Sequence, residues 1–139
     1  MSVQDFIAKR KTYSPDAKVT FHPMDYRDNI GETEASFDLL ISQYAGFISQ
    51  HCKRYLKLGG LLLVNDSHGD ASMACLDEDY ELIGVVMGRN GNYRITEQDL
   101  ADYFRPKSPM EITKAYLEKS QRGIGYKKSA GMYLFKRVK

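Results

Sequence analysis

Two short apolar runs with an amphipathic segment between them form the clearest pattern along the chain. The first run is Phe37 to Ser42, the second is Leu61 to Val64, and polar residues follow each of them. Between the runs, Ile48, Cys52 and Leu56 recur at the spacing of one helical face. The pattern predicts a strand, a crossover helix and a second strand parallel to the first, with both faces of the sheet covered.

The glycine pair Gly59-Gly60 is expected to end the crossover helix, because glycine adopts a left-handed cap without strain. Ligands of parallel sheets bind beyond the carboxyl ends of the strands, so we expect a functional site where the two runs end. The residues at these two ends are Ser42, Gln43, Tyr44, Asn65, Asp66 and His68.

The N-terminal part is predicted to hold a helix and a strand. Ser2 can cap a helix that reaches to about Tyr13, because Asp5 stands three residues after it. Lys18 to His22 alternates between polar and apolar residues and predicts a strand, which Pro23 stops.

The C-terminal part is predicted to consist of short helices and strands. It predicts a helical turn over Ala71 to Leu76, strands over Tyr80 to Met87 and Tyr93 to Ile95 around a tight Asn90-Gly91 turn, a capped helix opening at Thr96, and a last strand over Met132 to Phe135. Met110 to Ser120 fits a helix or a strand.

The composition is typical of one soluble globular domain over residues 1–139. Hydrophobic residues make up 42% and charged residues 27%. No apolar run approaches the roughly 18 residues of a membrane span. The two cysteines match neither a disulfide framework nor a zinc spacing, so we expect no metal and a reducing cytosol.

Charge is distributed unevenly along the chain. From Phe104 onward ten lysines and arginines face two glutamates, which gives +8, and since the total is +2, the first 103 residues carry −6. Such a basic part can attract phosphate groups or an acidic partner. The alternative is that these lysines cover the solvated side of edge strands and prevent edge pairing.

Three segments resemble a class I S-adenosylmethionine-dependent methyltransferase. Val19 to Asp25 looks like the family's third strand with the acid that follows it. Phe37 to Ser42 looks like its fourth strand, and Arg54 to Val64 is similar to the helix and fifth strand. The resemblance implies a truncated Rossmann-like sheet of parallel strands, closed by an antiparallel pair formed by Ile112 to Leu117 and Met132 to Arg137.

The resemblance also implies an incomplete cofactor site. The family's strand order is 3-2-1-4-5-7-6, and the chain lacks the first two strands, the glycine-rich turn after the first and the acid that ends the second. We therefore expect weak or no binding of S-adenosylmethionine by the chain alone. Because unpaired strands tend to pair between chains, we also expect a homo-oligomer formed through the exposed sheet edge, or else an irregular sheet.

The family's site residues carry over onto a few positions. Asp25 would accept a hydrogen bond from the adenine amino group, and the backbone amide of Tyr26 would meet a ring nitrogen. Ser42, Gln43 and Tyr44 would line the cofactor and the transferred methyl group. Each of these also fits a plain structural role, Asp25 in a turn and the others in a solvated loop.

Asp66 and His68 are the candidate catalytic pair, since they combine an acid and an imidazole after a buried strand. They could remove a proton from the methyl acceptor, whereas the alternative is that Asp66 caps the next turn and His68 is exposed. The sequence thus favours a methyltransferase, or a fragment of one, acting on a small molecule. The alternative function is a non-catalytic Rossmann-like interaction module whose basic C-terminal face binds a partner, nucleic acid included.

Overall fold

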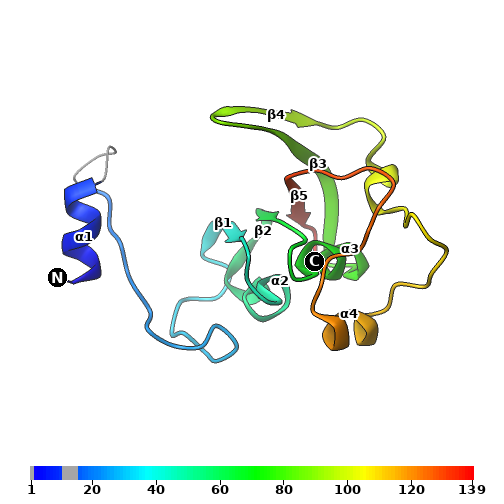
Figure 1. The fold of residues 1–139 in the computed structure, drawn as a ribbon. Helices are drawn as coiled ribbons and strands as arrows, with labels where there is room; N and C mark the ends of the chain where they lie inside the picture. Colours follow the sequence, from blue (N-terminus) through cyan, green and yellow to red (C-terminus); the bar gives the residue numbers. More distant parts are fainter. Residues whose placement is uncertain (1, 11–15) are drawn as a thin grey trace.

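The structure, a computed structural model, describes residues 2–10 and 16–139 and consists of one mixed sheet with short helices (Figure 1). The strands are β1 Phe37–Ser42, β2 Leu56–Val64, β3 Tyr80–Arg89, β4 Asn92–Thr96 and β5 Met132–Arg137. The helices are α1 Val3–Arg10, α2 Ile48–His51, α3 Asp70–Leu76 and α4 Lys114–Ser120, with 3₁₀ helices η1 Lys53–Tyr55 and η2 Leu100–Phe104. The predicted α/β class is confirmed.

The two apolar runs lie side by side and point in the same direction, as predicted. β1 pairs parallel with β2, with Leu39 opposite Leu61 and Ser42 opposite Val64. The connection between them is shorter than the predicted helix, because α2 ends at His51 and Leu56 already has extended backbone as the first residue of β2. Gly59-Gly60 therefore lies inside β2, and the prediction that it ends a helix is wrong.

The rest of the sheet is antiparallel, which corrects the expectation of a mainly parallel sheet. The strand order is β1-β2-β5-β3-β4, and only β1 and β2 run parallel. β5 pairs with β2 on one side and with β3 on the other. The expected partner of β5, Ile112 to Leu117, overlaps α4 instead, because Thr113 caps this helix by accepting a hydrogen bond from the Tyr116 amide at 3.1 Å.

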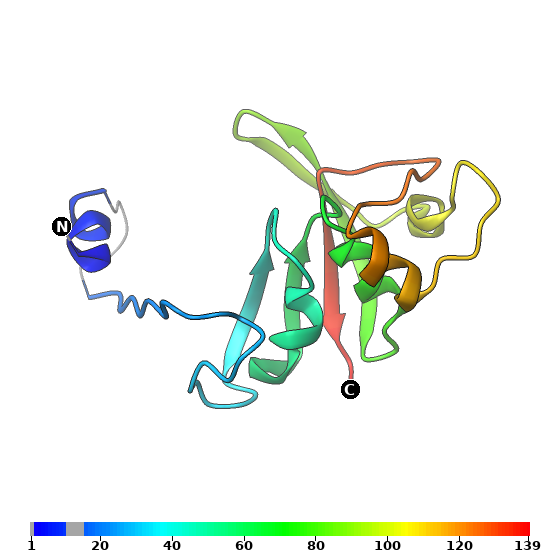
Figure 2. The same ribbon diagram turned by 60° about the horizontal axis from the view of Figure 1, so that its bottom comes forward.

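The core lies on one side of the sheet, the side on which α2, α3 and α4 are found (Figure 2). Leu62, Val64 and Phe135 are at most 1% exposed there and pack with Ala71 and Ala74 of α3. Side chains alternate between the two faces of a strand, so the residues between these positions point to the opposite face. We call that side the open face; the register places Leu39, Ile41, Leu61, Leu63 and Leu134 on it.

Several other predictions have definite outcomes. Helix α1 begins as expected, with the Asp5 amide donating to Ser2 Oγ at 3.1 Å, and its expected end near Tyr13 lies outside the described residues. The turn Asn90-Gly91 is confirmed, with positive φ at both residues. Thr96 does not cap a helix; the 3₁₀ helix η2 follows Asp99, which makes no side-chain cap.

The predicted strand over Lys18 to His22 is not formed, and these residues are irregular. A strand requires a hydrogen-bonded neighbour, and these residues do not pair with β1, the edge strand nearest to them. Both views show α1 apart from the sheet on the side of β1, with this irregular segment between them (Figures 1 and 2). Within residues 2–10 and 16–139, none of the helices has the length and apolar character needed to cross a membrane.

Candidate functional site

A pocket of about 270 Å³ lies where β1 and β2 end, at the place that the sequence predicts. Three separate segments form its wall: the residues after β1, the residues after β2, and the loop that leads into β5. We call it the carboxyl-end pocket. Its lining residues are Tyr44, Asn65, Asp66, Ser67, Gly123, Ile124, Tyr126, Ser129, Ala130, Gly131 and Tyr133.

Tyr44 is held at the mouth of this pocket by its backbone. Its amide donates to Asn65 Oδ1 at 3.1 Å, and Asn65 Nδ2 donates to Gln43 Oε1 at 3.4 Å, so the ends of the two strands are tied together. Tyr44 has a left-handed φ of 51°, which is uncommon for a bulky residue, and its side chain is 75% exposed. The phenol is therefore free to meet a ligand at the rim.

Asp66 connects the end of β2 with α3 and with the loop that leads into β5. Its carboxylate accepts hydrogen bonds from the Ser72 amide at 2.8 Å, the Ser72 hydroxyl at 2.9 Å and the Ile124 amide at 3.0 Å. Burial raises the pKa of Asp66, against the opposing effect of these hydrogen bonds. A side chain at Gly123 would collide with the Asp66 carbonyl, so the loop approaches this closely only with glycine there.

Ser42 belongs to a buried network under the pocket. Its hydroxyl donates to Asp70 Oδ2 at 2.6 Å, and the Ser49 amide donates to the same oxygen at 3.1 Å. Ser42, Ser49 and Asp70 are each at most 2% exposed. Burial raises the pKa of Asp70, while its hydrogen bonds lower it. This network joins β1, α2 and α3, and Ser42 does not line the carboxyl-end pocket.

The other candidate residues lie elsewhere. His68 is exposed on the turn before α3 and does not line the pocket. Asp25 is exposed and forms an ion pair of 2.6 Å with Arg27, whose hydrogen bonds lower the pKa of Asp25 to about 2. Tyr26 stacks edge-on against His51 with 5.7 Å between ring centroids. The structure therefore places Tyr44 and Asp66 in the wall of the pocket, with Gln43 bonded to Asn65 beside them, and leaves Asp25, Tyr26 and His68 apart.

The loop before β5 supplies pocket residues that the sequence did not indicate. Tyr126 and Tyr133 are 5% and 3% exposed, and burial raises the pKa of both phenols. The Tyr126 hydroxyl lies 2.6 Å from Ser72 Oγ, which also binds Asp66. Gly123 and Gly125 are the sequence signal that could have indicated a loop in close contact with another segment. That segment could not be identified from the sequence, because Asp66, which bonds to Ile124 of the loop, lies 58 residues earlier in the chain.

The pocket offers hydroxyl, amide and aromatic groups to a ligand, and one carboxylate whose oxygens already have donors. Among the described residues, no group of three histidine, cysteine or acidic side chains could hold a metal ion. Comparisons with models of known protein families, with curated proteins and with solved structures gave no match. A function is therefore inferred from this geometry and from the resemblance of the three sequence segments.

Proposed function

We propose that the chain is the second half of a methyltransferase-like domain, in which the carboxyl-end pocket holds the methyl acceptor of an S-adenosylmethionine-dependent reaction. The observation that carries the proposal is the strand sequence β1-β2-β5-β3, with the first pair parallel and the following pairs antiparallel. It supports the equivalence of these strands with 4-5-7-6 in the order that the resemblance implies. Strand β4 is an addition to that order.

The size of the pocket favours a small acceptor. Small-molecule sites usually measure about 300–1,000 Å³, and the 270 Å³ present here are too little for acceptor and cofactor together. The groups proposed to contact adenine lie outside the pocket, with Asp25 already paired to Arg27. We therefore expect the chain alone to bind the cofactor weakly, through the methyl-facing side only.

Orientation is the main contribution that these residues can make to methyl transfer. The acceptor atom attacks the methyl carbon, and the bond to the sulfonium breaks with its electron pair left on sulfur, so alignment of the two reactants matters most. Asp66 is the one proposed acid-base group in the pocket wall, and its oxygens are engaged with Ser72 and Ile124. We propose that Tyr44 and Asn65 position the acceptor.

Titration with S-adenosylhomocysteine tests this function. In amide NMR spectra, we expect the largest shifts at Tyr44 and Asn65, with a dissociation constant on the order of 1 mM. Tyr44→Ala should weaken the binding, because it removes the exposed ring at the rim. Tyr116→Ala, on α4 and 45% exposed, is the matched control and should leave it unchanged.

Two results would count against the proposal. Shifts confined to residues outside the carboxyl-end pocket would remove the assignment of the site. Binding in the micromolar range or tighter would contradict the view that the chain carries only part of a cofactor site.

The second candidate function is an interaction module, and the β1 edge favours it. A mostly apolar groove of about 300 Å³ runs along this edge, between β1 and the irregular N-terminal segment. Leu39 and Ile41 are 48% and 55% exposed there. Phe37–Ser42 carries one charge, at Asp38, and neither lysine nor proline, the residues that commonly protect an edge. We propose that a second copy pairs with β1 and forms a homodimer.

Light scattering tests the dimer. Leu39→Lys should convert it to a monomer, since a charge would be buried beside the partner strand. Leu58→Lys is the matched control, because Leu58 is 66% exposed on β2 and away from the edge, and it should leave the dimer intact. A wild-type protein that remains monomeric at high concentration would contradict edge pairing.

A further inference from the structure

The hairpin formed by β3 and β4 extends beyond the rest of the sheet (Figure 1). Pairing between β3 and β5 stops at Val86, opposite Met132, whereas β3 continues to Arg89. In the hairpin ladder, Met87 stands opposite Arg94, and Arg89 stands opposite Asn92. Because side chains alternate along a strand, these four share one face of the projecting tip.

Arg89 and Arg94 belong to the basic side chains of the described residues that form no ion pair. The ion pairs of the structure engage other basic side chains, such as Lys53 with Asp77 and Asp79 and Arg105 with Asp102. In the described part of the chain, no ion pair or hydrogen bond involves the side chain of Arg89 or Arg94, and both are exposed. From Met87 to Ile95 the sequence contains no acid, so the tip carries two uncompensated positive charges.

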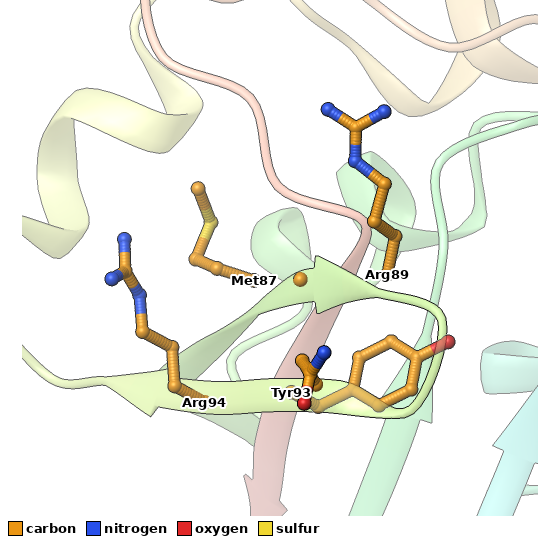
Figure 3. A pocket seen from close by; sticks show the side chains of 6 residues that line it. Met87, Arg89, Tyr93 and Arg94 are labelled. Carbon is orange, nitrogen blue, oxygen red and sulfur yellow. The ribbon is translucent and has the colours of Figure 1, made fainter.

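A hollow of about 640 Å³ lies between these side chains (Figure 3). Its lining residues are Met87, Gly88, Arg89, Asn92, Tyr93 and Arg94. Figure 3 shows both guanidinium groups on the same side of the hairpin, with Met87 between them. Gly88 has a φ of +126°, and any side chain there would collide with the Asn92 carbonyl, so glycine permits the close strand pairing.

These groups match the chemistry of a single-stranded nucleic acid. Guanidinium groups bind phosphate oxygens with paired hydrogen bonds, and two of them can contact successive phosphates. Tyr93 stands opposite Gly88 and points to the other face of the hairpin, where it is 59% exposed. Its ring can stack on an unpaired base where the nucleic acid passes around β4, the outermost strand. We propose that the β3–β4 tip binds single-stranded nucleic acid, with Arg89 and Arg94 on the phosphates and Tyr93 on a base. This site is separate from the carboxyl-end pocket.

The test is fluorescence anisotropy with a labelled single-stranded oligonucleotide of roughly 12 nucleotides, first at low salt and then over a salt series. The wild type should bind, and binding should weaken steeply with salt. The double variant Arg89→Glu/Arg94→Glu should lose at least about tenfold in affinity. The slope of log affinity against log salt concentration should fall by about 1.4, which is about 0.7 for each phosphate contact removed from a single strand.

Matched variants separate a site from general charge attraction. Lys119→Glu/Arg122→Glu changes the net charge equally at two exposed positions near α4 and should keep most of the affinity. Tyr93→Ala should lower the affinity for the oligonucleotide about fivefold or more, because the base loses the ring on which it stacks. Tyr93→Phe keeps the ring and should keep the affinity. Circular dichroism checks that each variant is folded.

Four results would overturn the proposal. They are no binding by the wild type at low salt, equal losses in the two charge-reversed pairs, equal affinity for a duplex of the same length, and full competition by inorganic phosphate at concentrations matched to the phosphates of the oligonucleotide. The last would reduce the site to a general anion site.

Discussion

Asp70→Ala is expected to lower the free energy of unfolding by about 2–4 kcal/mol, because two buried donors lose their acceptor. The Ser42 hydroxyl and the Ser49 amide both donate to this carboxylate, and Ser49 is 0% exposed, so water cannot replace the lost bonds. Relief from the cost of burying the carboxylate offsets part of the loss. Urea denaturation measures the result, against a total stability of about 5–15 kcal/mol for a domain of ordinary size.

The matched control for this prediction is Asp38→Ala. The side chain of Asp38 is 86% exposed and its ion pair with Lys57 lies at the surface, so the change should stay within about 0.5 kcal/mol. A loss at Asp70 no larger than the loss at Asp38 would contradict the role of the network in joining β1, α2 and α3.

The effect of Asp70→Ala should also depend on pH. Burial raises the pKa of Asp70, so the folded protein holds this proton more tightly than the unfolded chain does. The contribution of Asp70 to the free energy of unfolding therefore falls as pH rises from the ordinary aspartate pKa to the raised value. Asp70→Ala lacks this pH-dependent contribution. The difference in the free energy of unfolding between wild type and Asp70→Ala should therefore be larger in acid than at neutral pH. Asp66 remains in both proteins, so its titration largely cancels in the comparison.

The predictions that succeeded from sequence are those with a strong local cause. The runs Phe37 to Ser42 and Leu61 to Val64 form paired strands because they are apolar, short and bounded by polar residues. Asn90-Gly91 forms the hairpin turn because both residues tolerate positive φ. Each of these signals lies within a few residues of the structure that it produces.

The predictions that failed needed a partner distant in sequence. Val19 and Phe21 alternate as a strand would, but in the described part of the chain this segment does not pair with the free edge of β1, which lies across a groove from Thr20 and His22. Gly59-Gly60 has the residues of a helix end, yet Leu56 is buried and pairs with Phe37, so the strand begins before the glycines. The candidate site shows the same limit. About half of the residues that line the carboxyl-end pocket come from the loop at residues 123–131, which is distant in sequence from Tyr44 and Asp66.

Strand β5 is the central strand of the sheet, and its side chains alternate between the covered face and the open face. Among its residues, we expect Phe135→Ala to give the largest loss in the free energy of unfolding. Phe135 is 1% exposed, stands opposite Leu62 and Leu82, and packs against the Tyr80 ring with 6.2 Å between centroids. Truncation leaves a cavity between β2, β3 and η2, so we expect a loss of about 3–5 kcal/mol. Denaturant titration followed by circular dichroism measures it.

The neighbouring residue supplies the control, because Leu134 lies on the same strand but points to the open face. It is only partly buried, so Leu134→Ala should cost about 1 kcal/mol. Equal losses at the two positions would mean that a second layer covers the open face, either from another copy or from a further segment. A loss confined to Phe135 would mean that the sheet folds with one covered face, which leaves Leu39 and Ile41 available for a partner at the β1 edge.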